Sequence, residues 1–159
     1  MLQTIFINSP IGITKIVGDE NGISIISVVE ECDISKTIPK ELQEAVSQLK
    51  DYFDGKRTDF NLKLNPKGTE FQQKVWKELQ NIPYGKTISY LDLSKKLGNV
   101  KTIRAAATAN GKNPIWIVIP CHRVIGTDGS LTGYAGGLWR KKWLLEHENP
   151  SNQQSLFEI

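Results

Sequence analysis

The sequence predicts an α+β protein in which a small antiparallel sheet with one helix is followed by a mostly helical segment. Short β-rich runs fill the first 29 residues, whereas apolar residues recur at helical spacing after residue 69. The charge also changes sign, because residues 1–64 hold 7 Lys and Arg against 10 Asp and Glu, net −3, and the remainder holds 13 against 7, net +6. We therefore expect a domain of residues 1–64, a second domain of residues 65–150, and a C-terminal tail of residues 151–159.

Three strands are predicted at residues 2–8, 11–18 and 23–29, which are rich in β-branched residues. The second and third are joined by Asp19–Gly22, whose Asn-Gly step suits a tight hairpin turn. These features predict a small antiparallel sheet.

A helix that covers one face of this sheet is expected between Pro39 and Gly55, since proline suits the start of a helix and glycine its end. Phe60, Leu62 and Leu64 then alternate with polar residues and predict a further strand. The Asn-Pro-Lys-Gly stretch that follows is typical of a linker.

Helices are predicted again after the linker. Thr69 opens the first with a capping box, Ser89 opens the second in the same way, and a third runs from about Val100 to Asn110. Two short helices joined by a glycine-containing turn outline a helix-turn-helix, whose second helix usually enters DNA. Many helical proteins contain such a corner, so the outline alone does not establish DNA binding.

The third of these helices carries almost no bulk, because residues 104–109 read Arg-Ala-Ala-Ala-Thr-Ala. Two interpretations remain open: close packing against another helix, or a slim helix in the minor groove of DNA with Arg104 at its leading end. The net positive charge of this half fits a surface that binds a polyanion, and it equally fits an ordinary solvated surface.

The apolar run from Ile115 to Ile119 is short and rich in β-branched residues, which predicts a buried strand. Pro120 ends it and delivers Cys121 and His122 into a turn, where a thiol and an imidazole can serve one pocket.

A working cysteine needs a base or a positive field that favours its thiolate. His122 and Arg123 can supply both, and Glu148 is a candidate to orient the histidine. The alternative is that Cys121 is a buried small hydrophobic residue. The chain has two cysteines, without a Cys-x-x-Cys or Cys/His cluster, so we expect no disulfide framework, no metal site and no cofactor.

A glycine-rich loop at residues 133–137 lacks the spacing of a phosphate-binding loop and suits a pocket wall. A last helix is expected to end near Glu148. Its predicted apolar face comprises Leu138, Trp139, Trp143, Leu144 and Leu145.

Several motifs in the second half closely resemble those of the O6-alkylguanine-DNA alkyltransferases. The resemblance also reaches back through Phe71, Tyr84 and Ser89 to the linker. The motifs that carry it are Asn113-Pro114, Ile119–Val124 with its Pro-Cys-His-Arg-Val signature, Gly133–Leu138 and Trp143–Glu148. The first domain matches only in general plan. For it the resemblance implies a ribonuclease-H-like α+β domain, ahead of a winged-helix or helix-turn-helix domain.

The resemblance implies that Cys121 takes an alkyl group from O6-alkylguanine in DNA and keeps it, so that each molecule acts once. O4-alkylthymine is a second candidate substrate. His122 would take the thiol proton through a water, Glu148 would orient it, and Asn113 would brace the active-site loop. Tyr90 would turn the phosphate and protonate the leaving guanine.

The same resemblance assigns the remaining site residues. Those expected to line the base pocket are Tyr134, Ala135, Gly136 and Val124. The backbones of Val124 and Cys121 would accept hydrogen bonds from the guanine amino group. Those expected to face DNA are Arg104, which would fill the gap in the base stack, Ala105, Ala106, Thr108 and Arg123. A base must leave the duplex before a thiolate can reach it, and an inserted arginine supports that extrusion.

Two positions depart from the family pattern. Ala135 stands where some members have serine, so the preference for particular alkyl groups is open. Trp116 is large for its place and is expected to narrow the pocket against bulky adducts.

The expected partner is double-stranded DNA, bound through its minor groove by a monomer. The chain has no stretch long and apolar enough for a membrane span and no signal-peptide pattern, which predicts a cytoplasmic protein. Gln153–Phe157 resembles sliding-clamp-binding peptides, but the tail could instead pack on its own domain. Two other function classes remain open, a helix-turn-helix regulator with a structural cysteine and a cysteine hydrolase.

Overall fold

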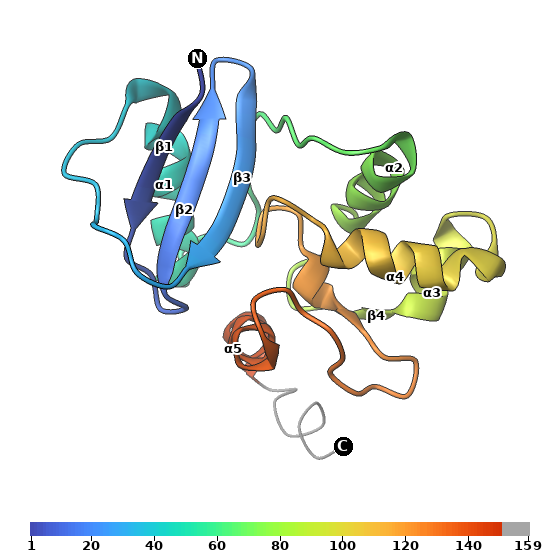
Figure 1. Ribbon diagram of the computed structural model, residues 1–159. Helices are drawn as coiled ribbons and strands as arrows, with labels where there is room; N and C mark the ends of the chain where they lie inside the picture. Colours follow the sequence, from blue (N-terminus) through green and yellow to red (C-terminus); the bar gives the residue numbers. More distant parts are fainter. Residues whose placement is uncertain (151–159) are drawn as a thin grey trace. The chain divides into compact units, whose positions relative to one another are not determined.

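The computed structural model describes residues 1–150 of the 159-residue chain, and its contacts divide the chain into two compact units (Figure 1). The first unit is Met1–Lys67 and the second begins at Gly68. Within the described part, no helix has both the length and the apolar composition that a membrane crossing requires.

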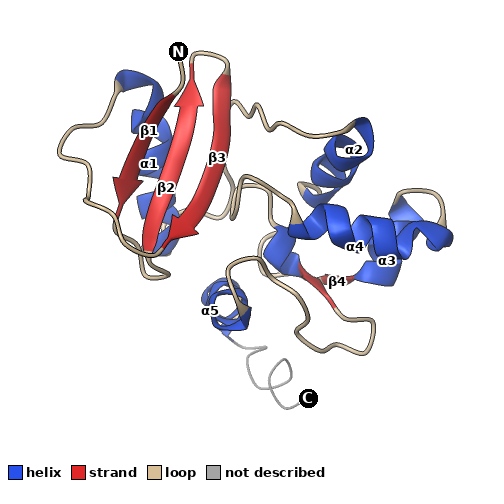
Figure 2. Ribbon diagram, in the orientation of Figure 1, coloured by secondary structure: helices blue, strands red, loops and turns tan. Residues whose placement is uncertain are grey.

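The first unit is built on the expected antiparallel sheet of three strands (Figure 2). Its strands are β1 (Gln3–Ile7), β2 (Ile13–Asp19) and β3 (Gly22–Val29), in the order β1-β2-β3. The turn between β2 and β3 lies where the Asn-Gly step predicts it, and Gly22 has the positive φ of 126° that such a turn requires. Aligned residues on one face, Ile5, Ile16 and Ile26, are buried.

Helix α1 (Lys40–Phe53) covers one face of this sheet, as predicted (Figure 1). It begins after Pro39 and ends before Gly55, and its buried stripe includes Leu42, Ala45, Val46 and Leu49. The helix approaches the sheet closely at Gly18, where a Cβ atom would come within 3.1 Å of Leu42.

The strand predicted over residues 60–64 is wrong. This segment makes a single parallel bridge, between Leu64 and Ile23 of β3. Its backbone is held instead by a side chain of α1: Gln48 donates to the Asn61 carbonyl at 3.1 Å and accepts from the Asn61 amide at 2.9 Å. Since the Gln48 amide satisfies both polar groups of that residue, no neighbouring strand is needed there.

The second unit contains the expected helices and a two-stranded parallel sheet (Figure 2). Its elements are α2 (Glu70–Leu79), β4 (Ile88–Ser89), α3 (Tyr90–Lys96), the 3-10 turn η1 (Val100–Thr102), α4 (Ile103–Gly111), the 3-10 turn η2 (Cys121–Arg123), β5 (Val124–Ile125) and α5 (Leu138–Glu148). Both predicted capping boxes are present, at Thr69 and at Ser89. The pair α3 and α4 forms the predicted helix-turn-helix outline.

Helix α4 is fixed against α2 and α3. Trp76 of α2 is buried and donates its indole N–H to the Ala109 carbonyl at 2.9 Å. The small buried side chains Ala106 and Ala109 allow this close approach. Close packing against another helix, the first of the two interpretations of the alanine-rich segment, therefore holds for one face of α4.

The buried strand predicted from Ile115 to Ile119 is also wrong, although the segment is buried. It folds into a turn in which Ile117 has a φ of 72° and Ile119 N donates to Ile115 O at 3.1 Å. Asn113 compensates for the missing sheet bonds, because its side chain donates to the carbonyls of Ile115 and Ile119 at 3.2 and 2.7 Å and accepts from Ile115 N at 3.0 Å.

The apolar face predicted for the last helix requires a correction. In α5, Leu144 and Leu145 are buried as expected, but about half of the surface of Leu138 and Trp139 is exposed. Lys141 lies fully buried in their place, at 0% exposure.

Candidate active site

Cys121 begins the short turn η2 and is buried, with 4% of its surface exposed. Its amide donates to Ile119 O at 2.8 Å, so the position of the thiol depends on the turn that Asn113 braces. The other cysteine, Cys32, is exposed and belongs to the first unit.

Next to the cysteine, three charged or polar side chains form a buried network. His122 Nε2 lies 2.7 Å from Glu148 Oε2, and Arg123 binds both oxygens of the same carboxylate, from Nε at 2.8 Å and from Nη2 at 3.1 Å. Arg123 Nη1 also donates to Ile82 O at 2.7 Å. Glu148 therefore binds both residues that follow Cys121 in η2, His122 and Arg123.

The electrostatics of this network favour a neutral histidine beside an ionised glutamate. Burial alone would raise the pKa of Glu148, but the attraction and hydrogen bond of His122, together with Arg123, lower it far below its usual value. Burial lowers the pKa of His122, although Glu148 acts in the opposite direction. In the neutral ring, Nε2 donates to Glu148 and Nδ1 is an acceptor, and Nδ1 is buried with no hydrogen-bond partner in residues 1–150. His122 thus has a free lone pair with which to take a proton.

Cys121 itself is protonated in this state. Burial raises the pKa of its thiol to about 11, although hydrogen bonding from Asn113 and the charge of Lys141 act to lower it. The sequence predicts that Arg123 favours the Cys121 thiolate through its positive charge. Its guanidinium is instead bound to Glu148, whose negative charge offsets it. A thiol of this kind reacts only when a base removes its proton.

Tyr90 of α3 interacts electrostatically with the cysteine. Burial raises the pKa of its phenol, and the charge of a Cys121 thiolate would raise it further. Its hydroxyl lies 3.5 Å from Thr132 O. The phenol is therefore a protonated group within the electrostatic reach of Cys121.

The glycine-rich loop packs against Trp116. The rings of Tyr134 and Trp116 meet with centroids 5.4 Å apart, and the Tyr134 hydroxyl is buried without a partner in the described part of the chain. Gly136 is buried under Trp116, where a Cβ atom would come within 2.7 Å of the indole ring. Ala135 is exposed.

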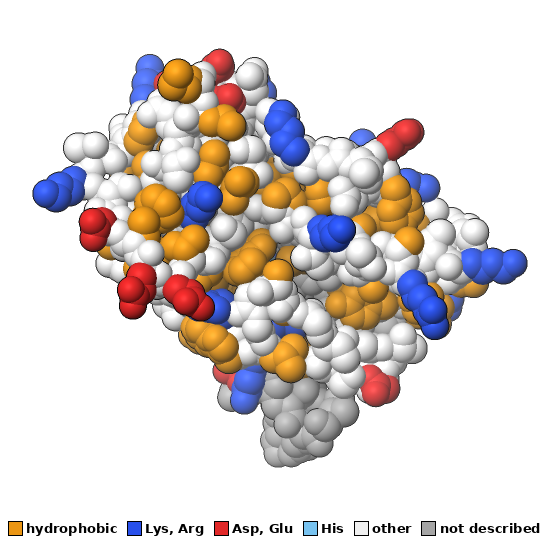
Figure 3. Space-filling view, viewed as in Figure 1, with side chains coloured by type: hydrophobic (Ala, Val, Ile, Leu, Met, Phe, Trp, Pro, Cys, Tyr) orange, Lys and Arg blue, Asp and Glu red, His pale blue; other side chains and the backbone are white. Residues whose placement is uncertain are grey.

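Not all residues predicted to face DNA lie on the surface. Arg104, Ala105 and Thr108 are exposed on α4, and Lys and Arg side chains project from the region of α3 and α4 in Figure 3. Ala106 is fully buried, because it faces the core that α4 shares with α2 and α3. Arg123 is 6% exposed and bound to Glu148, so the DNA contact predicted for both residues is wrong.

Lys141 lies next to the site, but the sequence motifs do not assign it there. Its ammonium donates to Val124 O at 2.6 Å and to Thr132 O at 2.8 Å. A signal was present, because Lys141 lies on the same helical stripe as Leu144, Leu145 and Glu148, which places it facing the core.

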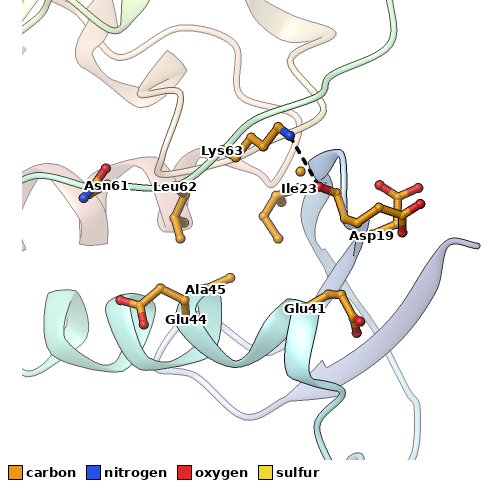
Figure 4. Close-up of a pocket in the computed structure, with 10 residues that line it drawn as sticks. Asp19, Ile23, Glu41, Glu44, Ala45, Asn61, Leu62 and Lys63 are labelled. Atoms are coloured by element: carbon orange, nitrogen blue, oxygen red, sulfur yellow. Dashed lines mark hydrogen bonds between the residues drawn. The ribbon is translucent and has the colours of Figure 1, made fainter.

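The first unit has a pocket of different character. Figure 4 shows Glu41 and Glu44 of α1 facing Leu62 and Lys63 across it, and Asp19 at one end. Lys63 donates to Glu20 O at 3.4 Å. The lining carries four carboxylates and one ammonium, and this negative charge repels phosphate, so the pocket is unsuited to DNA. No three His, Cys, Asp or Glu side chains in residues 1–150 are grouped so as to hold a metal ion.

Two protein families match the two units in turn. The family described as 6-O-methylguanine DNA methyltransferase, ribonuclease-like domain, matches residues 2–66. The family described as 6-O-methylguanine DNA methyltransferase, DNA binding domain, matches residues 70–150. These matches confirm the predicted fold class.

Similar proteins cover nearly the whole chain. A methylated-DNA--protein-cysteine methyltransferase of Methanosarcina acetivorans is 45% identical, over 93% of this chain and 98% of its own. One of Mycolicibacterium paratuberculosis is 42% identical, over 98% of both.

Solved structures agree. The crystal structure of Mycobacterium tuberculosis O6-methylguanine methyltransferase superimposes with a TM-score of 0.85 at 42% identity, over 94% of both chains. The M. tuberculosis protein in complex with DNA gives a TM-score of 0.82 at 43% identity, over 96% of this chain and 97% of that one. The resemblance found in the motifs is confirmed, and the chain belongs to the 6-O-methylguanine DNA methyltransferase family.

Proposed function

We propose that this protein repairs alkylated DNA by moving an alkyl group from O6 of guanine to the sulfur of Cys121, which keeps it. The observation that carries the proposal is the buried thiol of Cys121 next to the His122–Glu148 pair, in a unit that also presents a helix-turn-helix. A regulator with a merely structural cysteine has no need for this pair.

The chemistry follows from the protonation states. His122 takes the thiol proton through a water at Nδ1, and Glu148 stabilises the imidazolium that forms. The thiolate attacks the alkyl carbon, the sulfur–carbon bond forms and the carbon–O6 bond breaks. The guanine leaves with the electron pair and takes a proton from Tyr90, whose raised pKa keeps it protonated until then. No step regenerates the thiol, so one molecule acts once.

The pocket for the extruded base is bounded by the glycine-rich loop. Tyr134, Ala135 and Gly136 form its wall, and the carbonyl of Val124 accepts from the guanine amino group. Gly136 leaves room for the Trp116 ring, which supports a narrow pocket that favours a methyl group over bulky adducts.

DNA is bound by α4, which enters the minor groove with its exposed face. Arg104 fills the space that the extruded base leaves in the stack, and Ala105 and Thr108 allow the backbone close approach. We further propose that the protein acts as a monomer in the cytoplasm. The clamp-binding peptide proposed at Gln153–Phe157 lies outside the described residues.

The test is a transfer assay on a duplex oligonucleotide that contains O6-methylguanine, followed by mass spectrometry. We expect one methyl group per molecule, on the peptide that contains Cys121. Cys121→Ala abolishes transfer, and the matched control Cys32→Ala leaves it unchanged because Cys32 is an exposed thiol in the other unit. No transfer by the wild type, or transfer that survives Cys121→Ala, contradicts the proposal.

A further inference from the structure

Asn110 carries a polar atom that the transfer chemistry described so far does not use. The residue lies in the last turn of α4 and is 3% exposed, and its Nδ2 donates to Cys121 O at 3.4 Å. Its Oδ1 is buried with no hydrogen-bond partner in residues 1–150. An unsatisfied buried acceptor is destabilising, whereas a leucine of similar size would leave none there. The amide oxygen therefore calls for a donor that enters the site from outside.

The Asn110 amide lies between the two groups that act on the substrate. It is bonded to the carbonyl of Cys121, which takes the alkyl group, and it interacts with Tyr90, which protonates the leaving guanine in the proposed function. Burial raises the pKa of the Tyr90 phenol, and hydrogen bonding from Thr132 and from Asn110 acts in the opposite direction. An extruded base that reaches both Cys121 and Tyr90 therefore comes to lie beside this amide.

The chemistry of guanine brings its amino group to the same point. When the carbon–O6 bond breaks, the leaving guanine takes its proton on a ring nitrogen, either N1 or N3. Both nitrogens flank the ring carbon that carries the exocyclic amino group. A side chain that interacts with the proton donor is thus next to the amino group, and an amino N–H is the kind of donor that a free carbonyl oxygen accepts from.

The backbone acceptors near the cysteine leave one hydrogen of that amino group without a partner. Val124 O, the acceptor proposed above, already accepts from Lys141 Nζ at 2.6 Å, so it has one lone pair left. Cys121 O accepts from the Val124 amide as well as from Asn110, which occupies both of its lone pairs. The amino group has two hydrogens, so the second needs another acceptor, and Asn110 Oδ1 is free to accept it.

We propose that Asn110 is a specificity-determining residue, whose Oδ1 accepts a hydrogen bond from the exocyclic amino group of the extruded guanine. This inference rests on the proposed function and goes beyond it, because it assigns the choice between substrates to one side chain. O4-alkylthymine has no such amino group, so its binding leaves Oδ1 unsatisfied. Asn110 therefore favours O6-alkylguanine over O4-alkylthymine.

The test compares two duplexes that differ in the amino group alone. One contains O6-methylguanine, and the other contains O6-methylhypoxanthine, the same purine without the amino group. Single-turnover transfer to Cys121 is measured on each duplex at saturating DNA, and the readout is the ratio of the two rate constants. A residue that merely supports the fold changes both rates together and leaves this ratio as it was.

Three variants separate the role of the acceptor from packing. Asn110→Leu removes both polar groups at similar size, whereas Asn110→Asp keeps an oxygen acceptor and loses the Nδ2 donor. Asn81→Leu is the matched control, because Asn81 is an exposed asparagine of the same unit.

We expect the wild type to favour the O6-methylguanine duplex by roughly 10-fold or more. Asn110→Leu should lose most of this preference, chiefly through a slower reaction with O6-methylguanine. Asn110→Asp should keep the preference whatever its absolute rates, and Asn81→Leu should match the wild type on both duplexes.

Two results overturn the inference. One is a wild-type protein that reacts with both duplexes at the same rate. The other is a wild-type ratio in Asn110→Leu, whether or not its rates fall, which would reduce Asn110 to a brace for the Cys121 carbonyl. Should Asn110→Leu not fold by thermal unfolding, Asn110→Ala takes the same measurements. A wild-type protein that accepts no methyl group from either duplex contradicts the proposed function instead, so the two failures are distinguishable.

Discussion

His122 and Glu148, 26 residues apart in the sequence, meet at 2.7 Å with both side chains almost completely excluded from solvent. The pair joins the turn that carries the cysteine to the end of the last helix. It therefore affects both the reaction and the stability of the second unit.

Replacing Glu148 by glutamine should damage both properties. The change leaves the buried guanidinium of Arg123 without its countercharge, so we expect a loss of about 3 kcal/mol in the free energy of unfolding. Transfer should slow by roughly 100-fold or more, because the imidazolium is no longer stabilised. Urea unfolding and single-turnover transfer measure the two effects. Glu70→Gln, at an exposed carboxylate, should change neither, and an equally small effect at Glu148 would remove its assigned role.

Acid should destabilise the protein through the same pair. The folded-state pKa of His122 and that of Glu148 both lie below their usual values, so each contributes stability above its unfolded pKa and loses it as the pH falls. Stability should decline first below about 6.5 from His122 and again below about 4.3 from Glu148. Thermal unfolding should be measured from pH 7 to pH 3. The loss of stability below about pH 4.3 should be present in the wild type and smaller in Glu148→Gln. Parallel curves for the two proteins would contradict this assignment.

Adding one methyl group at position 136 should disturb the pocket. The Cβ of Gly136→Ala would lie 2.7 Å from the Trp116 ring and 2.9 Å from Tyr134, so these rings must move. We expect roughly a 10-fold or greater loss in transfer rate. A double variant with Trp116→Leu should recover part of this rate, since it removes the clash. Equal rates for the single and double variants would show that the contact does not matter.

Arg104 should matter for duplex DNA and not for the chemistry. Arg104→Ala removes an exposed cation from the leading end of α4, so transfer from duplex should slow and binding should depend less on salt concentration. Reaction with free O6-methylguanine base, which needs no extrusion, should remain as in the wild type. A matched control is Lys112→Ala, an exposed cation just beyond the other end of the same helix. A uniform loss on both substrates would place Arg104 in the folding of the unit instead.

Elements whose signals are local could be predicted from the sequence. The hairpin turn at Asn21-Gly22 and the capping boxes at Thr69 and Ser89 are fixed by neighbouring residues, and the structure has them in place. Both wrong strands have one physical cause. In residues 60–64 the Gln48 amide satisfies the backbone of Asn61, and in residues 115–119 the Asn113 amide satisfies the backbone of Ile115 and Ile119, in place of strand pairing at these residues.

The site divides in a similar way. Cys121 and His122 could be found because a motif of adjacent residues contains them. The burial of Arg123 and Ala106 could not be read from those motifs, because it depends on which faces of η2 and α4 meet the core. Arginine and lysine are usually exposed, so the sequence pattern favoured a surface role for Arg123 that the fold does not allow.

The burial of Cys121 has a consequence for the protein before it meets damage. Oxidants and electrophiles attack accessible thiolates, and this thiol is both enclosed and protonated, with a pKa of about 11. The exposed Cys32 is the more accessible target for such reagents. A protein that can react only once is thereby protected from being used up by stray chemistry, and it keeps its capacity until an alkylated base enters the pocket.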